Sequence, residues 1–359
     1  MYTVLRKSAV VFVVTACALA LIFVGFENGT NHAQATNGAR AEKPANVVGL
    51  PGYDIDVFAK GTASYSNPDS VDVAGKHVYI GYQNVTAKDG SDNKSSTVVE
   101  YTLDGKVVRT FSVPGHCDGL RFNPTTHLLW ATSNEDGNPR IVTINPDNGV
   151  VTPYTFPAAP HGGGYDDVIF LNGTAFIAAS NPTLDNAGIN KFPAVDKIEL
   201  KDGKAILTPV LLGNASALDT TTNKTVPLNL TDPDSMTVDT QGNLVLVDQA
   251  DAQLIVVDDP GQSKQEVKRI PVGTQVDDTL WIRSKEGNLL VVDGKQNAIY
   301  SVTINKTDFT PGTVYTEAPA DAGVAGFVGT VDLKTGTIVP VIIGLTSPTG
   351  MGFIPKENA

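Results

Sequence analysis

Most of the chain alternates between apolar and polar residues in short runs, which are separated by Gly, Pro, Asn and Asp. Alternation with a period of two is typical of β-strands, and almost no stretch has the i, i+3, i+4 spacing of a core helix. One unit shows the pattern clearly, with strands predicted over 118–123, 127–133, 140–144 and 150–156. The pattern therefore predicts an all-β protein built from four-stranded antiparallel units.

A recurring motif, an acidic residue directly before an alternating strand, sets out these units. Its copies start 49, 48, 68, 44 and 71 residues apart, at Asp69, Asp118, Asp166, Asp234, Asp278 and, in a weaker form, Thr349. A repeat near 45 residues is the period of a propeller blade. We therefore predict a six-bladed β-propeller of four-stranded blades, closed by the N- and C-terminal strands.

The two long spacings, of 68 and 71 residues, determine where we place the insertions and the strands of the closing blade. The 68-residue interval contains polar insertions at 181–191 and 214–231, which are sized for surface loops. The turn at Gly287-Asn288 is assigned to the Asp278 blade. The closing blade is predicted to combine strands from both ends of the chain, at 53–58, 327–333, 337–343 and 351–355.

The N-terminus has the pattern of a targeting segment, because Arg6 and Lys7 precede an uncharged apolar run over 9–26. We predict a signal peptide over 1–35, a linker over 36–52 and the propeller over 53–359. The mature protein is then secreted, or periplasmic in a bacterium. An uncleaved anchor and a lipoprotein lipidated at Cys17 remain alternatives.

The net charge of −12, from 38 acidic and 26 basic side chains, excludes some partners. A chain this acidic is repelled by phosphate backbones and anionic lipids, so we predict neither nucleic-acid nor membrane binding once the signal is removed. With 41% hydrophobic residues the chain can bury a sizeable core. We expect a monomer whose partner is a small polar molecule, or a protein or glycan.

Cysteine and asparagine usage bear on the export route. Cys117 is the one cysteine left after Cys17 departs with the signal, so no internal disulfide is predicted. Two interpretations of the frequent Asn-x-Ser/Thr sequons stay open: a secreted glycoprotein, or a bacterial exported protein rich in Asn/Thr turns. The predicted acceptors in the mature chain are Asn84, Asn93, Asn172, Asn214, Asn223, Asn229 and Asn305.

The motif's carboxylates provide the candidate site. In a propeller the innermost strands start at one end of a central channel, so five aspartates should meet at its mouth. Such carboxylates repel one another unless a cation joins them, and calcium suits oxygen ligands. Alternatively, each aspartate caps the turn before its strand. The predicted ligand-binding residues are Asp69, His116, Asp118, Asp166 and Asp278.

His161 and its glycine run, Gly162-Gly163-Gly164, are predicted to enter the same mouth. The glycines would allow close backbone approach to a ligand, and His161 could act as a general base. The alternative is a flexible loop with a solvated histidine. No G-x-S-x-G elbow occurs in the chain, so serine-esterase chemistry lacks its signature.

The stretch from Asp232 to Asp248, DPDSMTVDTQGNLVLVD, resembles the signature of NHL-repeat and SMP-30/gluconolactonase-like six-bladed propellers. The resemblance implies a divalent cation on the propeller axis, with Asp234 as the metal-binding aspartate. Asp118 and Asp166 stand where the family has asparagine, and Asp69 where it has an early glutamate.

The resemblance also implies a function. A metal-dependent lactone or ester hydrolase would use the divalent cation, which we expect to be calcium, together with Asp234 or His161 to move the proton. The predicted catalytic residues are thus Asp234 and His161, and the predicted metal ligands are Asp234, Asp118 and Asp166. A non-catalytic ligand- or protein-binding propeller scaffold is the alternative.

Overall fold

The computed structural model describes residues 42–305, 308–320, 323 and 325–356. The predicted signal peptide and its alternatives therefore lie outside the described residues. The chain from Ala41 onward forms one compact unit. Within the part that the structure describes, no helix has the length and apolar character needed to cross a bilayer.

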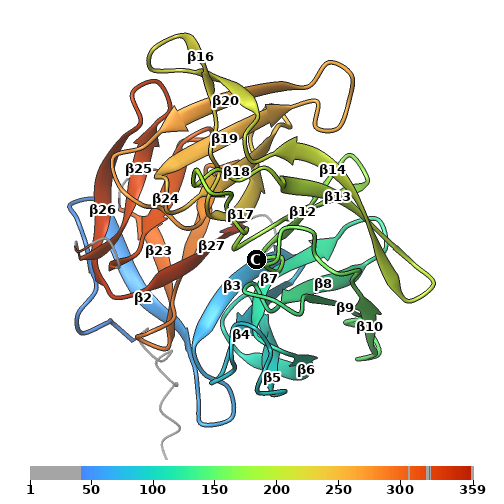
Figure 1. The fold of residues 1–359 in the computed structure, drawn as a ribbon. Coiled ribbons are helices and arrows are strands. Elements are labelled where there is room, and N and C mark those ends of the chain that lie inside the picture. Colours follow the sequence, from blue (N-terminus) through green and yellow to red (C-terminus); the bar gives the residue numbers. More distant parts are fainter. Residues whose placement is uncertain (1–41, 306–307, 321–322, 324, 357–359) are drawn as a thin grey trace, which may run out of the picture. The chain divides into compact units, whose positions relative to one another are not determined.

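The strands of the described residues form six blades of at least four strands around a central axis, each with one innermost strand (Figure 1). The first four blades follow chain order from the axis outward. Blade 1 is β3 (Pro68–Ala74), β4 (His77–Tyr82), β5 (Ser95–Thr102) and β6 (Val107–Pro114). Blade 2 is β7 (Cys117–Asn123), β8 (Leu128–Ser133), β9 (Arg140–Ile144) and β10 (Val151–Thr155). Blade 3 is β11 (Val168–Leu171), β12 (Thr174–Ala178), β13 (Pro193–Lys201) and β14 (Lys204–Leu212). Blade 4 is β17 (Pro233–Val238), β18 (Leu244–Asp248), β19 (Gln253–Asp258) and β20 (Glu266–Pro271).

The last two blades are interleaved in the chain. Blade 5 runs from β21 (Thr279–Trp281) to β24 (Val314–Ala318), β25 (Gly326–Asp332) and β26 (Thr337–Leu345), with β1 (Val48–Gly49) at its edge. Blade 6 runs from β27 (Pro348–Pro355) to β22 (Gly287–Asp293), β23 (Ala298–Ile304) and β2 (Tyr53–Lys60). The chain thus leaves blade 5 after one strand, builds the middle of blade 6, and then returns.

This order confirms the predicted closure by both chain ends and corrects the strands assigned to it. The strands predicted at 327–333 and 337–343 belong to blade 5, and the strand after Gly287 belongs to blade 6. The strand after Gly287 is assigned to blade 6 because β22 pairs with β27 over its whole length, from Gly287 opposite Pro355 to Asp293 opposite Pro348. Alternation alone cannot choose between two equally apolar partners for β21.

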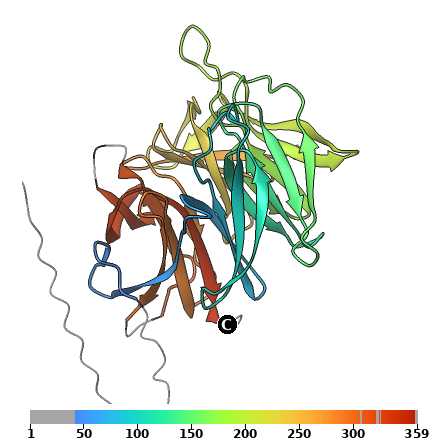
Figure 2. The ribbon, with the colours of Figure 1, turned by 90° about the horizontal axis from the view of Figure 1, so that it is seen from below.

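The innermost strands close the ring. Each innermost strand contacts the next one, in the order β3, β7, β11, β17, β21 and β27, and β27 contacts β3. Seen from below, these strands run roughly along the axis (Figure 2). The seam between the first and last blades is a core in which Val71 and Ile80 pack with Leu290 and Val292. A closed ring has no free innermost edge to pair with other chains.

Three further features join elements that the sequence left separate. Within the predicted loop 214–231, β15 (Ser216–Asp219) and β16 (Lys224–Pro227) form a hairpin, and β15 pairs with β20. Thr155 of β10 lies opposite Lys204 of β14, which joins blades 2 and 3. Val47 is buried beside β1, so the propeller includes part of the predicted linker.

The predicted glycan acceptors fall into two groups. Asn84 donates hydrogen bonds to Ser95 and Thr97, and Asn229 donates one to Gly188, so these two side chains are engaged within the fold. Glycosylation itself stays a prediction. The exposed acceptors are Asn93, Asn172, Asn214, Asn223 and Asn305.

Candidate functional site at the channel mouth

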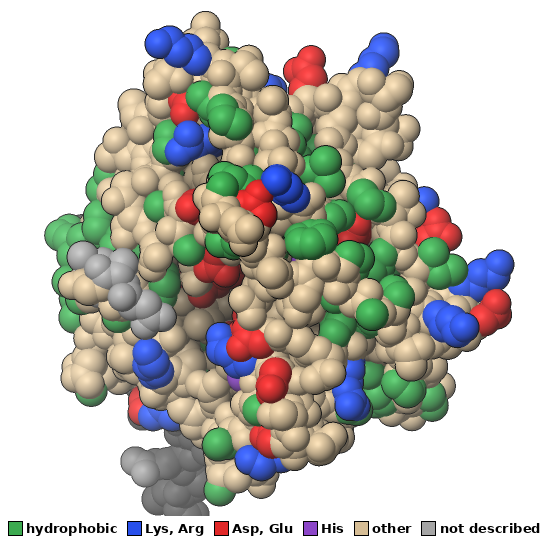
Figure 3. Space-filling view, in the orientation of Figure 1, with side chains coloured by type: hydrophobic (Ala, Val, Ile, Leu, Met, Phe, Trp, Pro, Cys, Tyr) green, Lys and Arg blue, Asp and Glu red, His purple; other side chains and the backbone are tan. Residues whose placement is uncertain are grey.

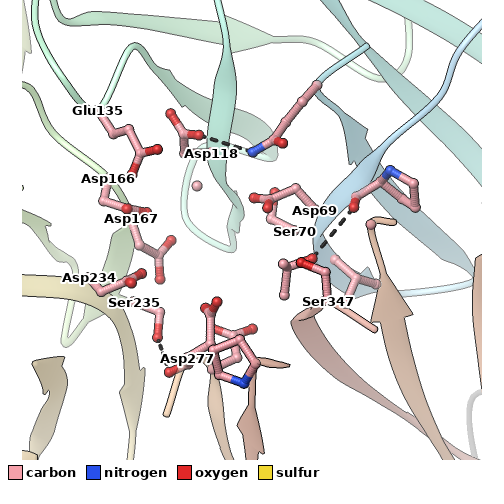
Figure 4. Close-up of a pocket in the computed structure, with 18 of the residues that line it drawn as sticks. Asp69, Ser70, Asp118, Glu135, Asp166, Asp167, Asp234, Ser235, Asp277 and Ser347 are labelled. Atoms are coloured by element: carbon pink, nitrogen blue, oxygen red, sulfur yellow. Dashed lines mark hydrogen bonds between the residues drawn. The ribbon is translucent and has the colours of Figure 1, made fainter. Parts of the chain in front are cut away.

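The innermost strands begin around a cavity of about 310 Å³ at one end of the channel. In Figure 4, acidic side chains from successive blades surround this open space. Figure 3 shows acidic groups around a hollow in the same face. The alternation explains this, since a buried residue precedes each mouth aspartate, as Pro68 precedes Asp69 and Pro233 precedes Asp234. The predicted residues placed there are Asp69, Asp118, Asp166, Asp234 and Asp278.

Asp278 nevertheless occupies a different position from the other four. Its Oδ2 accepts a hydrogen bond of 2.9 Å from the backbone N–H of Met351 in blade 6, so it links two innermost strands. Asp277 holds the mouth position of this blade, facing the shared space (Figure 4). Two adjacent aspartates made the register ambiguous, and a slip of one residue exchanges their directions.

The mouth is strongly acidic. Burial raises the pKa of each of the five carboxyls at the starts of the innermost strands, and the neighbouring carboxylates raise it further. The cavity therefore favours cations and hydrogen-bond donors over anions. Nearby, Lys88 forms an ion pair with Glu135 at the rim. The five carboxyls with raised pKa are Asp69, Asp118, Asp166, Asp234 and Asp277.

Arg121 of β7 forms the floor of this cavity. Its Nη2 donates to Oδ2 of Asp167 at 2.8 Å, and its Nη1 lies 3.9 Å from Oδ1 of Asp72. Arg121 also lines a second cavity, with Phe122 and Trp281, that does not share the mouth aspartates. The guanidinium thus divides the channel. In the sequence it is one polar residue of an alternating strand, with no signal of its own.

A group of three potential ligands lies at the edge of the mouth: His116, Asp118 and Glu135, with one donor atom from each within 4.8 Å of the others. Nδ1 of His116 lies 3.0 Å from the carbonyl oxygen of Thr86 and 2.8 Å from its hydroxyl. That hydroxyl donates to Gln83, so the carbonyl and the hydroxyl oxygen both accept from Nδ1–H.

This tautomer leaves Nε2 of His116 with a lone pair that faces carboxylate oxygens. Nε2 lies 3.5 Å from Oδ1 of Asp118, and burial lowers the pKa of the imidazole, which favours its neutral form. Neither Nε2 nor Oδ2 of Asp118 has a hydrogen-bond partner, and both atoms are buried. Buried polar atoms are normally satisfied, so the geometry fits a bound divalent cation.

The composition of this group differs from the predicted metal site. Of the three predicted ligands only Asp118 belongs to it, while Asp166 and Asp234 line other parts of the cavity. His116, predicted to contact a ligand, joins it. Glu135 was not predicted. It follows the end of β8, and residues just after the second strands of other blades, Gln83 and Gln249, line the same cavity. A polar residue just after the second strand of a blade was therefore the sequence signal that could have identified Glu135.

His161 does not line the channel mouth, contrary to its predicted role. It is buried, and its Nε2 lies 2.7 Å from the carbonyl oxygen of Gly164, within hydrogen-bonding distance. The glycines are needed for backbone packing: a Cβ on Gly163 would lie 2.2 Å from the Ser180 carbonyl oxygen. One on Gly164 would lie 2.0 Å from that of Asn134. The loop is thus packed rather than open to a ligand in the channel.

Comparison with known proteins yields structural neighbours only. No protein-family profile and no curated protein matches the sequence. A protein of unknown function from Bacteroides caccae has a TM-score of 0.47 and 11% identity over 80% of this chain and 86% of its own. Virginiamycin B lyase from Staphylococcus aureus has a TM-score of 0.44 and 12% identity over 70% of this chain and 100% of its own. A provisionally named 6-phosphogluconolactonase from Bacteroides uniformis has a TM-score of 0.46 and 13% identity over 82% of this chain and 90% of its own. The propeller assignment therefore rests on the sheet order described above.

Proposed function

We propose that this protein binds a small polar ligand at the channel mouth, together with a divalent cation held by His116, Asp118 and Glu135. The observation that carries the proposal is the pair of buried, unpartnered atoms, Nε2 of His116 and Oδ2 of Asp118. They lie in one group with Glu135. A cation satisfies both atoms and offsets the repulsion among the mouth carboxylates.

One imidazole and two carboxylates favour an ion that binds nitrogen as well as oxygen ligands. Calcium takes oxygen ligands, whereas Zn²⁺ and Mn²⁺ bind both imidazole and carboxylate. Thr86 holds the His116 ring through Nδ1, which is the outer-shell support that metal-bound histidines usually have. Lys88 pairs with Oε1 of Glu135, which leaves Oε2 as the second carboxylate oxygen. We therefore propose Zn²⁺ or Mn²⁺ in place of the calcium expected from the sequence.

The proposed reaction class is hydrolysis of a lactone or a related ester. A divalent ion supplies polarisation of the carbonyl and a bound water of lowered pKa. Asp166 and Asp234 line the same cavity and would orient the substrate through hydrogen bonds to its hydroxyl groups. Arg121, at the floor, would limit how far a ligand enters the channel.

Metal binding is tested by calorimetry with ZnCl₂, MnCl₂ and CaCl₂ on the metal-stripped chain. We expect one site that prefers Zn²⁺ or Mn²⁺, and a loss of affinity of about tenfold or more in His116→Asn. The matched control is His127→Asn, at an exposed histidine. Equal affinity in the two variants would exclude the proposed site.

Hydrolysis is tested separately, with a panel of aliphatic and sugar lactones followed by proton release. We expect activity that needs the metal and falls in His116→Asn but not in His127→Asn. Metal-dependent ligand binding without turnover would instead identify a non-catalytic binding propeller, which is the alternative from the sequence.

A further inference from the structure

A second cavity lies away from the channel, between the 156–167 loop and the β13–β14 hairpin of blade 3. Its volume is about 400 Å³, within the range of small-molecule sites. Its wall is largely apolar, with Pro160, Pro193 and Leu207 among the lining residues. It shares no lining residue with the channel-mouth cavity. Any ligand held here is therefore independent of the proposed metal site.

Two buried polar groups line this apolar cavity without a partner. Asp196 on β13 is 4% exposed, and among the described residues nothing forms a hydrogen bond or an ion pair with its carboxyl group. The hydroxyl of Tyr165 is buried and also has no hydrogen-bond partner. Polar groups of low exposure are destabilising when they have no partner, so a ligand that forms hydrogen bonds with them gains affinity.

The charge of the cavity selects the kind of ligand. Asp196 is the one acidic or basic residue among the described lining residues, apart from His161. Burial lowers the pKa of His161, whose Nε2 is bonded to Gly164, so this ring adds no positive charge near neutral pH. Burial raises the pKa of Asp196 to about 6, which leaves it mostly ionised at pH 7. An anionic ligand is thus disfavoured and a cationic one favoured.

Two of the lining residues, Tyr165 and His161, carry aromatic rings. Tyr165 stacks on Phe156 with ring centroids 4.9 Å apart, and His161 meets Tyr165 edge-on at 5.1 Å. Aromatic faces attract organic cations in addition to apolar groups. The close backbone packing of Gly163 and Gly164 holds this loop in place, so the cavity is formed before a ligand arrives.

We propose that this cavity binds a small organic monocation, an ammonium group on an aromatic or aliphatic body. The ammonium donates to Asp196, the Tyr165 hydroxyl supplies a second polar contact, and the apolar body lies against the proline-rich wall. Recognition then combines one charge-assisted hydrogen bond with burial of apolar area.

The test uses phenethylammonium as the probe, with neutral phenethyl alcohol and anionic phenylacetate as comparisons, measured by calorimetry and ligand-observed NMR. We expect phenethylammonium to bind most tightly and Asp196→Asn to weaken it about tenfold or more. Tyr165→Phe should weaken it by a smaller factor. Affinity should also fall as the pH drops below the pKa of Asp196.

The matched control is Asp202→Asn, at an exposed aspartate with φ of 52° in the β13–β14 turn, which should leave affinity unchanged. His116→Asn should also have no effect, which separates this proposal from the metal site. Phenethyl alcohol binding as tightly as phenethylammonium, or an unchanged affinity in Asp196→Asn, would overturn the proposal. So would the absence of phenethylammonium binding at millimolar concentration.

Discussion

Arg121 of blade 2 and Asp167 of blade 3 form an ion pair of 2.8 Å in the interior of the channel. Asp167 accepts a further hydrogen bond of 3.0 Å from the backbone N–H of Met236 in blade 4. One carboxylate therefore connects three successive blades at their innermost strands. The contact between a carboxylate and the backbone of the next blade recurs at Asp278, which accepts a hydrogen bond from the N–H of Met351.

We predict that Arg121→Met lowers the free energy of unfolding by about 3 kcal/mol, because the buried Asp167 and the half-buried Asp72 lose their shared cation. Urea denaturation measures this change. Arg140→Met, at an exposed arginine, is the control and should have little effect. Combining Arg121→Met with Asp167→Asn should recover part of the loss. If Arg121→Met is as stable as the control, the ion pair does not join the blades energetically.

A second prediction concerns Glu317 on β24, which is fully buried with neither carboxyl oxygen hydrogen-bonded. Burial, and then the charge of Asp278, raise its pKa well above the usual value. The folded state thus keeps a proton that the unfolded chain loses, so this group's contribution to stability decreases as pH rises above the unfolded-state pKa.

Glu317→Gln removes that proton linkage. Its stability relative to the wild type should therefore improve with pH, by at most about 1.4 kcal/mol per pH unit. Thermal melts from pH 5 to pH 9 measure the difference, and Glu266→Gln, at an exposed glutamate, is the control. A constant offset across the pH range would mean that Glu317 is already ionised in the folded protein.

The two adjacent aspartates of blade 5 should respond in opposite directions. Asp278→Ala removes the bond to Met351 and is expected to cost about 1–3 kcal/mol. Asp277→Asn relieves repulsion at the mouth and should hold or raise the stability of the metal-free chain. Urea denaturation of both variants in EDTA checks this. The reverse order would restore the register expected from the sequence.

These aspartates also show how much of the site could be predicted from the sequence. The repeat was visible because each innermost strand needs alternating apolar residues after a polar start, and at Asp234 the register was unambiguous. At Asp277-Asp278 two identical side chains point in opposite directions, so the local sequence does not show which of them faces the channel mouth. Glu135 was missed for a different reason: it comes close to His116 because β7 pairs with β8, which places Cys117 opposite Ser133, whereas the sequence motif followed only the innermost strands.

The C-terminal strand supplies a fourth prediction. β27 pairs along β22 and contacts β3, with Met351 and Ile354 nearly fully buried. A chain ending at Ser347 should therefore lose the cooperative thermal transition, because β22 is left with an unpaired edge and β3 loses the strand that packs against it. Far-UV circular dichroism and limited proteolysis measure this. A chain ending at Lys356 is the control, and melting of the shorter chain like this control would contradict the closure of blade 6.

The interleaving of blades 5 and 6 constrains when the molecule can fold during its synthesis. Blades 1 to 4 are complete once residue 271 has left the ribosome, so they can form while translation continues. β2, by contrast, has no partner until β23 emerges, and blade 6 has no innermost strand until β27 is made. The ring therefore closes only after β27 has emerged from the ribosome. Until then, the nascent propeller exposes the sides of β3 and β22 that β27 later covers, and the uncovered edge of β22 is open to pairing with other chains.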